Sequence, residues 1–362
     1  MATPVSQAWT STSEPNRSTG ALGRIAQHVT NLRSSDFLEC PATRTPRTPQ
    51  ERLDASWTEP ARGTRREPKP GAAAAEEQGK TVLYLAYGSN LCNETFRGMR
   101  GIRPISQVNV MVPELRLTFD LPGIPYREPC FANSARRDPA EHRCSTGPLS
   151  HTNYHKDRWR KGMVGCVYEV TPSDYAHIIA TEGGGASYHD ILVTCHVLPD
   201  SDTVPDSPST PAFKAHTLFA PAIKDTSTPD LCTTDRFTRP DPSYAQPSAR
   251  YLKLIADGAS ELSLPAEYQD YLHQIRPYTI TTKRQAIGAT LFLSIWGPFV
   301  LLFFTITKMF QDDRGRSPKW LVLLGEMIFT SMWLNYDAVW KGSFGDGERT
   351  DDDGDDEKNV GM

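Results

Sequence analysis

The sequence predicts an α+β domain whose strands roll into a small, partly closed β-barrel flanked by helices. Three observations support this class. Short apolar segments that alternate with polar residues or carry β-branched side chains recur along the middle of the chain. Helix-like segments stand among them without regular alternation, and polar, proline-rich stretches separate the elements. This irregular order favours an α+β class over an α/β class with a parallel sheet.

The expected strands are short, and each is rich in residues that fit a pleated, half-buried surface. They are TVLYLAY (81–87), VNVMVPELRLTFD (108–120), MVGCVYEV (163–170), DILVTCHVL (190–198) and FKAHTLFA (213–220).

The first expected helix, TPSDYAHIIAT, carries clear start signals. Thr171 can cap it, Pro172 suits its first turn, and Asp174 suits its positive end. Two more helices are expected near the end of the domain, and three polar, proline-rich stretches are expected to be loop insertions. The helices are PSARYLKLIADGA (247–259) and PAEYQDYLHQI (265–275), and the insertions are 134–161, 199–212 and 224–247.

Composition divides the chain into four parts. Residues 1–80 are rich in Ser, Thr, Pro and Arg and have too few large apolar residues to bury a face, so we expect a disordered tail. Residues 81–280 form the folded domain, and residues 286–340 form an apolar region. The acidic residues 341–362 are expected to be a solvated tail.

Charge and cysteine content exclude several classes of function. The formal net charge of −4 gives no case for nucleic-acid binding, and the locally basic insertion around Arg136 to Lys161 is more typical of a solvated loop. The seven cysteines include no CxxC pair, and His151 and His155 have no third ligand nearby, so no metal or cofactor is expected. Reduced thiols in a cytosol-facing domain are the simplest interpretation. The N-terminus lacks the apolar segment of a secretory signal.

The apolar region predicts membrane attachment. Residues 286–307 carry no charge, and as a helix they extend roughly 33 Å, enough to cross a bilayer. Residues 320–340 are interrupted by Glu326 and Asp337. They either complete a hairpin as a second span or lie in the interface, with tryptophans as anchors. Basic residues flank the first span on both sides, so the charge pattern does not fix its orientation.

The stretch LAYGSNL ends a strand on Tyr87, Gly88, Ser89 and Asn90. A glycine there permits a tight turn in which consecutive N–H groups point at one spot, and such a concavity binds an anion, typically a carboxylate. Ser89 and Asn90 can add side-chain donors. By itself the tetrapeptide is equally typical of a plain turn.

The stretch IIATEGGGASYHD places Glu182 at the C-terminal end of a helix, where the dipole disfavours a negative charge. The glycines that follow leave room for a ligand. A partly desolvated carboxyl in that setting should have a raised pKa and can both accept and donate a proton near neutrality. Tyr188 can supply a hydroxyl to the same pocket. The alternative is an exposed glutamate before a glycine cap.

These motifs resemble those of the γ-glutamylcyclotransferase family. The resemblance rests on YLAYGSNL, on GMVGCVYEVTPSDYAHIIATEGGGASYHDILVTCHV, and on ARYLKLIADGASELSLPAEYQDYLHQIRPY, in the family's order over residues 81–278. The glycine-rich glutamate motif and the long insertions look most like fungal members, including the cyclotransferases of epipolythiodioxopiperazine toxin clusters. The family's fold would be a small β-barrel flanked by helices.

The resemblance implies a reaction that needs neither a metal nor a protein nucleophile. The α-amino group of a γ-glutamyl substrate attacks its own γ-carbonyl and releases 5-oxoproline and a free amine. By match of motif, Glu182 would transfer both protons. The loop that grips the γ-glutamyl group would contain Tyr84, Leu85, Ala86, Tyr87, Gly88 and Ser89, beside Asn90 and Tyr188. The expected substrate is a γ-glutamyl amino acid or a γ-glutamyl-cysteinyl conjugate.

Two departures from the family matter. KAHTLFAP offers His216 and Thr217 where small soluble members carry a substrate-contacting tyrosine, and soluble members lack the apolar C-terminal region. A second hypothesis therefore keeps the fold without the activity, as a membrane-tethered binding or scaffold protein. Hydrolysis to free glutamate is a third option. We expect a lipid bilayer and a small molecule as partners, a cytosolic catalytic domain, and no signal for the oligomeric state.

Overall fold

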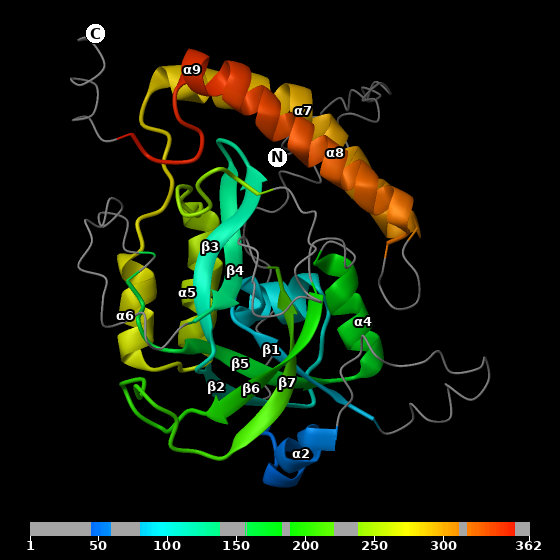
Figure 1. Ribbon diagram of the computed structural model, residues 1–362, viewed down its shortest axis with the longest axis vertical. Helices are drawn as coiled ribbons and strands as arrows, with labels where there is room; N and C mark the ends of the chain where they lie inside the picture. Colours follow the sequence, from blue (N-terminus) through cyan, green and yellow to red (C-terminus); the bar gives the residue numbers. More distant parts are fainter. Residues whose placement is uncertain are drawn as a thin grey trace, which may run out of the picture. The chain divides into compact units, whose positions relative to one another are not determined.

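Five strands close into a barrel in the order β1-β5-β2-β6-β7 (Figure 1). Neighbours pair antiparallel except β1 and β7, which run parallel and are joined at Tyr84 and His216. Every residue of β5 is buried, as expected for a strand covered on both faces. The α+β class is confirmed. The strands are β1 (Val82–Ala86), β2 (Ser106–Val112), β5 (Met163–Val170), β6 (His189–Val197) and β7 (Ala212–Phe219).

The structure is a computed structural model, and all the residues that it describes lie in one compact unit that starts at Thr45. Most of the expected N-terminal tail therefore lies outside the described residues, as do Tyr188 and most of two expected insertions. The described residues are 45–58, 80–137, 156, 158–182, 189–220, 238–310 and 317–351.

Part of the expected tail is ordered, which corrects the prediction for residues 45–58. Helix α2 (Gln50–Ala55) continues into the 3₁₀ turn η1 (Ser56–Thr58) and packs on the barrel. Arg52 holds it there, because its Nε donates to the carboxylate of Glu169 on β5 at 3.2 Å. A single ion pair to a strand far away in the sequence leaves no trace in local composition.

A separate hairpin rises from the barrel toward the C-terminal helices (Figure 1). It consists of β3 (Leu115–Ile124) and β4 (Glu128–Arg136), so the expected strand 108–120 is in fact two strands that belong to different sheets. At the hairpin tip Tyr126 adopts a φ of 66°. The sequence did not predict β4, because EPCFANSAR contains few residues that favour strands.

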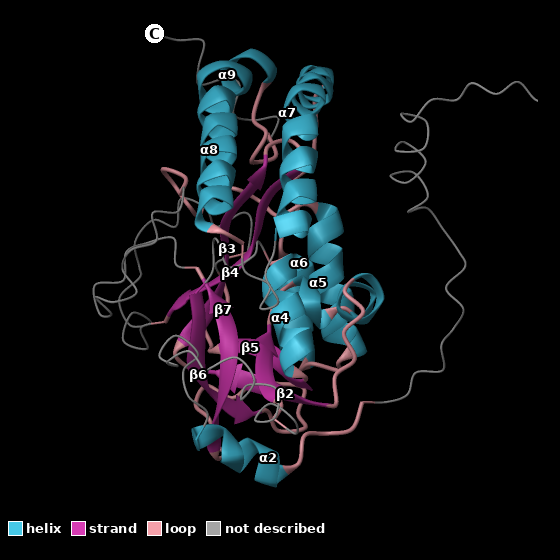
Figure 2. Ribbon diagram, turned by 90° about the vertical axis from the view of Figure 1, so that its right-hand side faces the viewer, coloured by secondary structure: helices cyan, strands magenta, loops and turns pink. Residues whose placement is uncertain are grey.

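Three helices flank the barrel at the expected positions (Figure 2). The side-chain oxygen of Thr171 caps α4 by accepting a hydrogen bond from the N–H of Asp174 at 3.1 Å. Ser248 caps α5 in the same way through the N–H of Tyr251. Two short helical segments follow β1. The elements are α4 (Pro172–Thr181), α5 (Ala249–Glu261), α6 (Ala266–Gln274), η3 (Ser89–Leu91) and the π-helical η4 (Glu94–Met99).

The apolar C-terminal region forms two helices that run side by side over the hairpin tip (Figures 1 and 2). They share a small core of their own, in which Phe292 and Tyr336 pack around Tyr126. Among the described helices, only α7 is long and apolar enough to cross a membrane. The elements are α7 (Lys283–Phe310), α8 (Lys319–Asn335), the π-helical η8 (Tyr336–Trp340) and α9 (Lys341–Phe344).

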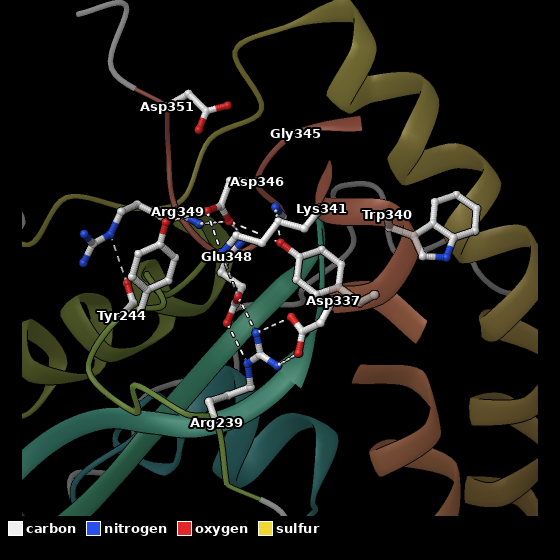
Figure 3. Close-up of polar contacts among 12 residues, drawn as sticks. Arg239, Tyr244, Asp337, Trp340, Lys341, Gly345, Asp346, Glu348, Arg349 and Asp351 are labelled. Atoms are coloured by element: carbon white, nitrogen blue, oxygen red, sulfur yellow. Dashed lines mark hydrogen bonds and ion pairs between the residues drawn. The ribbon is translucent and has the colours of Figure 1, made fainter. Parts of the chain in front are cut away.

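A cluster of polar and charged side chains links these helices to the rest of the unit (Figure 3). The guanidinium of Arg239 donates to both oxygens of Asp337 in η8, at 2.6 and 2.8 Å, and to both oxygens of Glu348, at 2.9 and 2.7 Å. The Tyr244 hydroxyl donates to Asp346 at 2.5 Å. We call these five residues the C-terminal clasp.

The clasp corrects the prediction that residues 341–362 are a solvated tail. Asp346, Glu348 and Thr350 are buried, with exposed fractions of 8%, 1% and 5%. A carboxylate can be buried when a guanidinium satisfies it with paired hydrogen bonds, and Arg239 supplies them. Residues 352–362 lie outside the described part.

We expect Arg239→Ala to lower the free energy of unfolding by about 3 kcal/mol, because it leaves the buried Glu348 carboxylate without its closest cationic partner. Denaturant unfolding of the full chain measures this effect. Lys253→Ala is the control, since it removes an exposed pair with Asp257 and should leave the midpoint unchanged. Equal midpoints for the wild-type and Arg239→Ala chains would contradict the role of the clasp.

Candidate active site

A cavity of about 600 Å³ lies where the ends of β1 and α4 and the start of α5 meet the β3–β4 hairpin and the C-terminal helices. A second cavity, of about 410 Å³, contains none of the predicted site residues. Leu85 and Ala86 are buried in the barrel wall and do not line the first cavity, and Tyr188 lies outside the described residues. The predicted residues that line it are Tyr84, Tyr87, Gly88, Ser89, Asn90 and Glu182.

Glu182 lies at the C-terminal end of α4, as the sequence predicts. Its N–H donates to the carbonyl oxygens of Ile178 and Ile179, so the last helical turn fixes its position. Its side-chain oxygen Oε1 accepts a hydrogen bond from Nδ2 of Asn90 at 3.1 Å, across 92 residues of sequence. The carboxyl group and the turn after β1 therefore meet in one cavity.

The turn after β1 is helical and starts at Gly88. The first hydrogen-bonded N–H groups of the turn are those of Leu91 and Cys92, which donate to the carbonyls of Gly88 and Ser89. The N–H groups before them have no partner within the turn, as at any helix start. A Cβ on Gly88 would lie 3.3 Å from the hydroxyl of Tyr251, so a larger residue here would press on this hydroxyl.

Two tyrosines of β1 and its end frame this turn. The hydroxyl oxygen of Tyr84 accepts a hydrogen bond from Nδ2 of Asn90 at 2.8 Å, so Asn90 is held by Tyr84 and Glu182 together. The other side-chain atom of Asn90, Oδ1, is buried and has no hydrogen-bond partner in the described part of the chain. The hydroxyl of Tyr87 donates to the carbonyl of Leu218 on β7 at 3.0 Å.

Arg100 also lines the cavity, although no sequence pattern singled it out. Its Nη2 donates to Oε1 of Glu182 at 2.5 Å, and its Nη1 donates to the hydroxyl of Thr181. This ion pair places a positive charge beside the carboxyl group at the end of α4. Arg100 follows the short helix η4 and lies 82 residues before Glu182 in the sequence, so no local pattern could reveal the pair.

Tyr251 of α5 also lines the cavity and was missed. Its hydroxyl oxygen accepts a hydrogen bond from the N–H of Ala132 on β4 at 3.2 Å, and its ring packs edge-on against Phe131 at 5.1 Å. Tyr251 therefore links the turn at Gly88 to the hairpin. The signal available in the sequence was its place in PSARYLKLIADGA, which lies within the third motif of the family resemblance.

His216 and Thr217, which replace the family's expected tyrosine, do not line the cavity. Nδ1 of His216 lies 2.7 Å from Oδ1 of Asp190, and the hydroxyl of Thr217 donates to the carbonyl of Leu85. The two side chains lie on opposite faces of β7, and both are buried. Tyr251 is therefore the residue that brings a phenol to this side of the cavity.

Burial raises the pKa of Tyr84 well above its usual value, and the negative charge of Glu182 raises it further. The pKa of Tyr251 is raised for the same two reasons, in the same order. Both hydroxyls are therefore neutral at physiological pH. The cavity thus combines a carboxyl group, a buried amide oxygen, neutral hydroxyls and the start of a helical turn, a set that suits a small ligand with an ammonium and a carboxylate.

We expect Tyr84→Phe to make the stability of the protein less sensitive to alkaline pH. Tyrosine in the unfolded chain loses its proton near pH 10, whereas folded Tyr84 keeps it, so this group's contribution is present below pH 10 and is lost above it. Above pH 10 the free energy of unfolding should fall with pH in both proteins. The slope should be steeper for the wild type than for the variant, by about 1.4 kcal/mol per pH unit. Urea unfolding between pH 9 and 11.5 measures the two slopes, and parallel slopes would contradict the shift.

Comparison with known proteins connects this geometry to a family. The chain is 31% identical over 282 residues to the γ-glutamyl cyclotransferase gliK of Aspergillus fumigatus, which covers 77% of the chain and 93% of that protein. It is 31% identical over 278 residues to the γ-glutamyl cyclotransferase aclK of Aspergillus oryzae, covering 75% and 92%.

Two further likenesses concern parts of the chain. The family model of the AclK C-terminal domain matches residues 282–342, which contain α7 and α8. A solved structure named γ-glutamyl cyclotransferase covers 56% of the chain and 93% of its own length, at 20% identity and a TM-score of 0.36, which is too low to support a structural argument. The similarity to gliK and aclK, which extends over nearly their whole length, shows that the chain is an enzyme that belongs to the γ-glutamyl cyclotransferase family.

Proposed function

We propose that the protein converts a γ-glutamyl amide into 5-oxoproline and a free amine, with Glu182 as the base and then the acid. The observation that carries the proposal is the hydrogen bond between Glu182 and Asn90, which joins the carboxyl group to the turn after β1. Both motifs were predicted to act on one substrate, and their contact in one cavity supports this prediction.

In the proposed reaction the substrate's α-ammonium first gives a proton to Glu182. The resulting amine attacks the γ-carbonyl carbon, and a new C–N bond closes the five-membered ring. The old amide bond then breaks, Glu182 returns its proton to the leaving nitrogen, and the attacking nitrogen gives its second proton to the same amine, which departs as an ammonium ion. Holding the chain folded supplies much of the rate enhancement, since both reacting groups belong to one molecule.

The two carboxylate oxygens of Glu182 would have different roles in this reaction. Arg100 and Asn90 both contact Oε1, and no described residue contacts Oε2. Oε1 would orient the carboxylate while Oε2 exchanges the proton. The unpartnered Oδ1 of Asn90 is available to accept a hydrogen bond from the ammonium group of the substrate.

The turn at Gly88 would bind the charged end of the substrate. Its unpaired N–H groups can hold the α-carboxylate or stabilise the negative charge that develops on the γ-carbonyl oxygen. Gly88 and Tyr251 both line the cavity, so the Tyr251 hydroxyl would lie beside a substrate bound at this turn. We propose a γ-glutamyl amino acid or γ-glutamyl-cysteinyl conjugate as the substrate class and secondary-metabolite biosynthesis as the context, following the resemblance to fungal members.

We expect Glu182→Gln to lower kcat/KM by about a thousandfold, because the amide cannot accept the proton of the substrate's ammonium. The assay measures 5-oxoproline released from γ-glutamyl-alanine by the full chain. Glu94→Gln, which changes an exposed glutamate outside the cavity, is the matched control and should keep wild-type activity. Undiminished activity of Glu182→Gln would refute the proton-transfer role. Free glutamate in place of 5-oxoproline would indicate hydrolysis, and ligand binding without turnover would favour the scaffold hypothesis.

We further propose that α7 and α8 attach the protein to a bilayer. Apolar side chains of both helices are exposed. Glu326 of α8 lines the cavity, and Asp337 of η8, whose side chain is 40% exposed, is neutralised by Arg239. We call the exposed residues the outer stripe. They are Ile287, Leu291, Ile295, Phe299 and Leu302 on α7 and Leu323, Met327 and Leu334 on α8.

The position of the helices favours an attachment in which both helices lie on the membrane surface, instead of one in which they cross the bilayer as two spans. Residues from both helices, such as Phe303 and Phe329, line the cavity beside Glu182, so these faces are turned to protein and not to lipid. An apolar face flanked by basic residues at the helix ends suits the interface of an anionic bilayer. Lys283, Lys308 and Lys319 stand at these ends.

We expect the full chain to float with vesicles that contain anionic lipid, because burying the outer stripe removes its apolar surface from water. Replacing Leu291, Ile295 and Phe299 together by serine should reduce the bound fraction about tenfold. Ile105→Ser, which changes an exposed isoleucine outside these helices, should not reduce it. A wild-type chain that stays unbound would contradict the proposal, and resistance to extraction at pH 11 would favour spanning over surface-lying helices.

A further inference from the structure

We infer that α7 and α8 form the leaving-group half of the active-site cavity and select a γ-glutamyl amide whose amine carries a large apolar body and no carboxylate. The inference rests on the proposed cyclisation, because it assigns the part of the cavity beyond the γ-glutamyl group. Within the substrate class proposed above, it favours conjugates with a large apolar group and no carboxylate next to the leaving nitrogen, and it ranks free γ-glutamyl amino acids below them.

The cavity has two chemically different halves. Polar groups gather at Glu182 and the turn after β1, and the opposite half is formed by apolar side chains of the hairpin and the C-terminal helices. Because the γ-glutamyl group needs the polar groups, the scissile amide would lie at the boundary and the amine would extend into the apolar half. The apolar half includes Leu121, Ile124, Phe131, Phe303, Phe329 and Trp333.

The apolar half begins next to the polar half without a break. Phe131 packs edge-on against Tyr251, with ring centroids 5.1 Å apart, and the Tyr251 hydroxyl lies close to Gly88. A substrate held at the turn would therefore present its leaving group to the Phe131 ring first and to the helices after it. Aromatic walls of this kind bind apolar groups through surface burial and ring contacts.

The helices contribute aromatic rings that are closely packed. The rings of Phe303 on α7 and Phe329 on α8 meet edge to face, with centroids 6.2 Å apart and an interplanar angle of 84°. A Cβ at position 325 would lie 2.6 Å from Cζ of Phe303, so glycine at this position lets the ring rest against α8. This close approach positions the two rings as one wall.

The C-terminal clasp and the hairpin fix this wall in place. The guanidinium of Arg239 lies 4.3 Å from the ring centroid of Trp333, and the indole Nε1 donates to the carbonyl of Gly123 at 3.2 Å. Since Arg239 also binds Asp337 and Glu348, the indole is held from both sides. A wall that is ordered before the ligand arrives loses little conformational entropy on binding.

The charges of the lining argue against a carboxylate on the leaving group. Its described cations are Arg100 and Arg250, and each is already in an ion pair, with Glu182 at 2.5 Å and with Glu128 at 2.7 Å. The apolar half contains an acidic side chain, Glu326. A carboxylate next to the leaving nitrogen would enter a region of apolar surface and like charge, which costs free energy.

Three substrates test the inference with the full chain: γ-glutamyl-alanine, γ-glutamyl-phenylalanine and γ-glutamyl-phenethylamide. The last two share an aromatic ring and differ in the carboxylate. We expect kcat/KM for 5-oxoproline release to be about tenfold or more higher for the phenethylamide than for the alanine substrate, with γ-glutamyl-phenylalanine between them.

Two variants assign the selectivity to the wall. Phe329→Ala should lower the ratio of kcat/KM for the phenethylamide to that for γ-glutamyl-alanine by about tenfold. Phe310 lies in α7, as Phe303 does, but it does not line the cavity. Phe310→Ala should therefore leave the ratio unchanged. Glu326→Gln changes no volume and should raise kcat/KM for γ-glutamyl-phenylalanine relative to the phenethylamide.

A binding measurement separates this inference from the proposed reaction. Calorimetry with the Glu182→Gln chain should show at least tenfold tighter binding of the phenethylamide than of γ-glutamyl-alanine, and that preference should be lost when Phe329→Ala is added. Preferential binding without turnover in the wild type would leave the wall assignment standing and overturn the reaction. Turnover of all three substrates with equal kcat/KM, or the absence of any preference in binding, would overturn the wall assignment.

Discussion

The site depends on the position of α4 against β1, because this packing brings the end of the helix within hydrogen-bond distance of the turn that follows the strand. Tyr175 of α4 packs against Tyr84 of β1 with ring centroids 5.9 Å apart, and Ile178 is fully buried on the same face. The last turn of α4 then determines where Glu182 lies. The Asn90 amide, held by two partners, closes the arrangement. A shift of α4 by one ångström would separate the carboxyl group from the turn.

The second requirement is continuity between the barrel and the C-terminal helices. The β3–β4 hairpin supplies it: its tip is buried between Phe292 and Tyr336, and its strands line the cavity. The helix pair is therefore part of the walls around the substrate. In the functions proposed above, its inner face would meet the ligand and its outer stripe would rest on a bilayer.

Much of the barrel could be predicted, because period-two patterns and helix caps are local signals. The segments MVGCVYEV, DILVTCHVL and TPSDYAHIIAT appear as strands or a helix within a residue or two of their expected positions. Glu182 and the turn at Gly88 could be named from motifs for the same reason. What failed was the assignment of polar segments. Asp346 and Glu348 look like solvated charges in the sequence. In the fold Lys341 pairs with Asp346, and Arg239, 109 residues from Glu348, pairs with Glu348.

Arg100 and Tyr251 show the same limit within the site. Each reaches the cavity through contacts between elements that are distant in sequence. Arg100 stands in no pattern that distinguishes it from other arginines, and Tyr251 is marked only by its place in a family motif. The hairpin could not be predicted, because the sequence of β4 favours a strand only weakly. Pairing with β3 and burial stabilise this strand, and both exist only in the folded state. Local sequence thus identifies the chemical groups, and tertiary contacts decide which of them act together.

The buried tip of the hairpin has a consequence for regulation. Tyr126 connects the helix pair mechanically to strands that line the cavity, so a displacement of the helices changes the space available to the leaving group. Thermodynamic linkage makes such coupling reciprocal: if contact with a membrane alters the affinity for a ligand by some factor, the ligand alters the affinity for the membrane by the same factor. An enzyme built this way would be sensitive to the surface on which it rests.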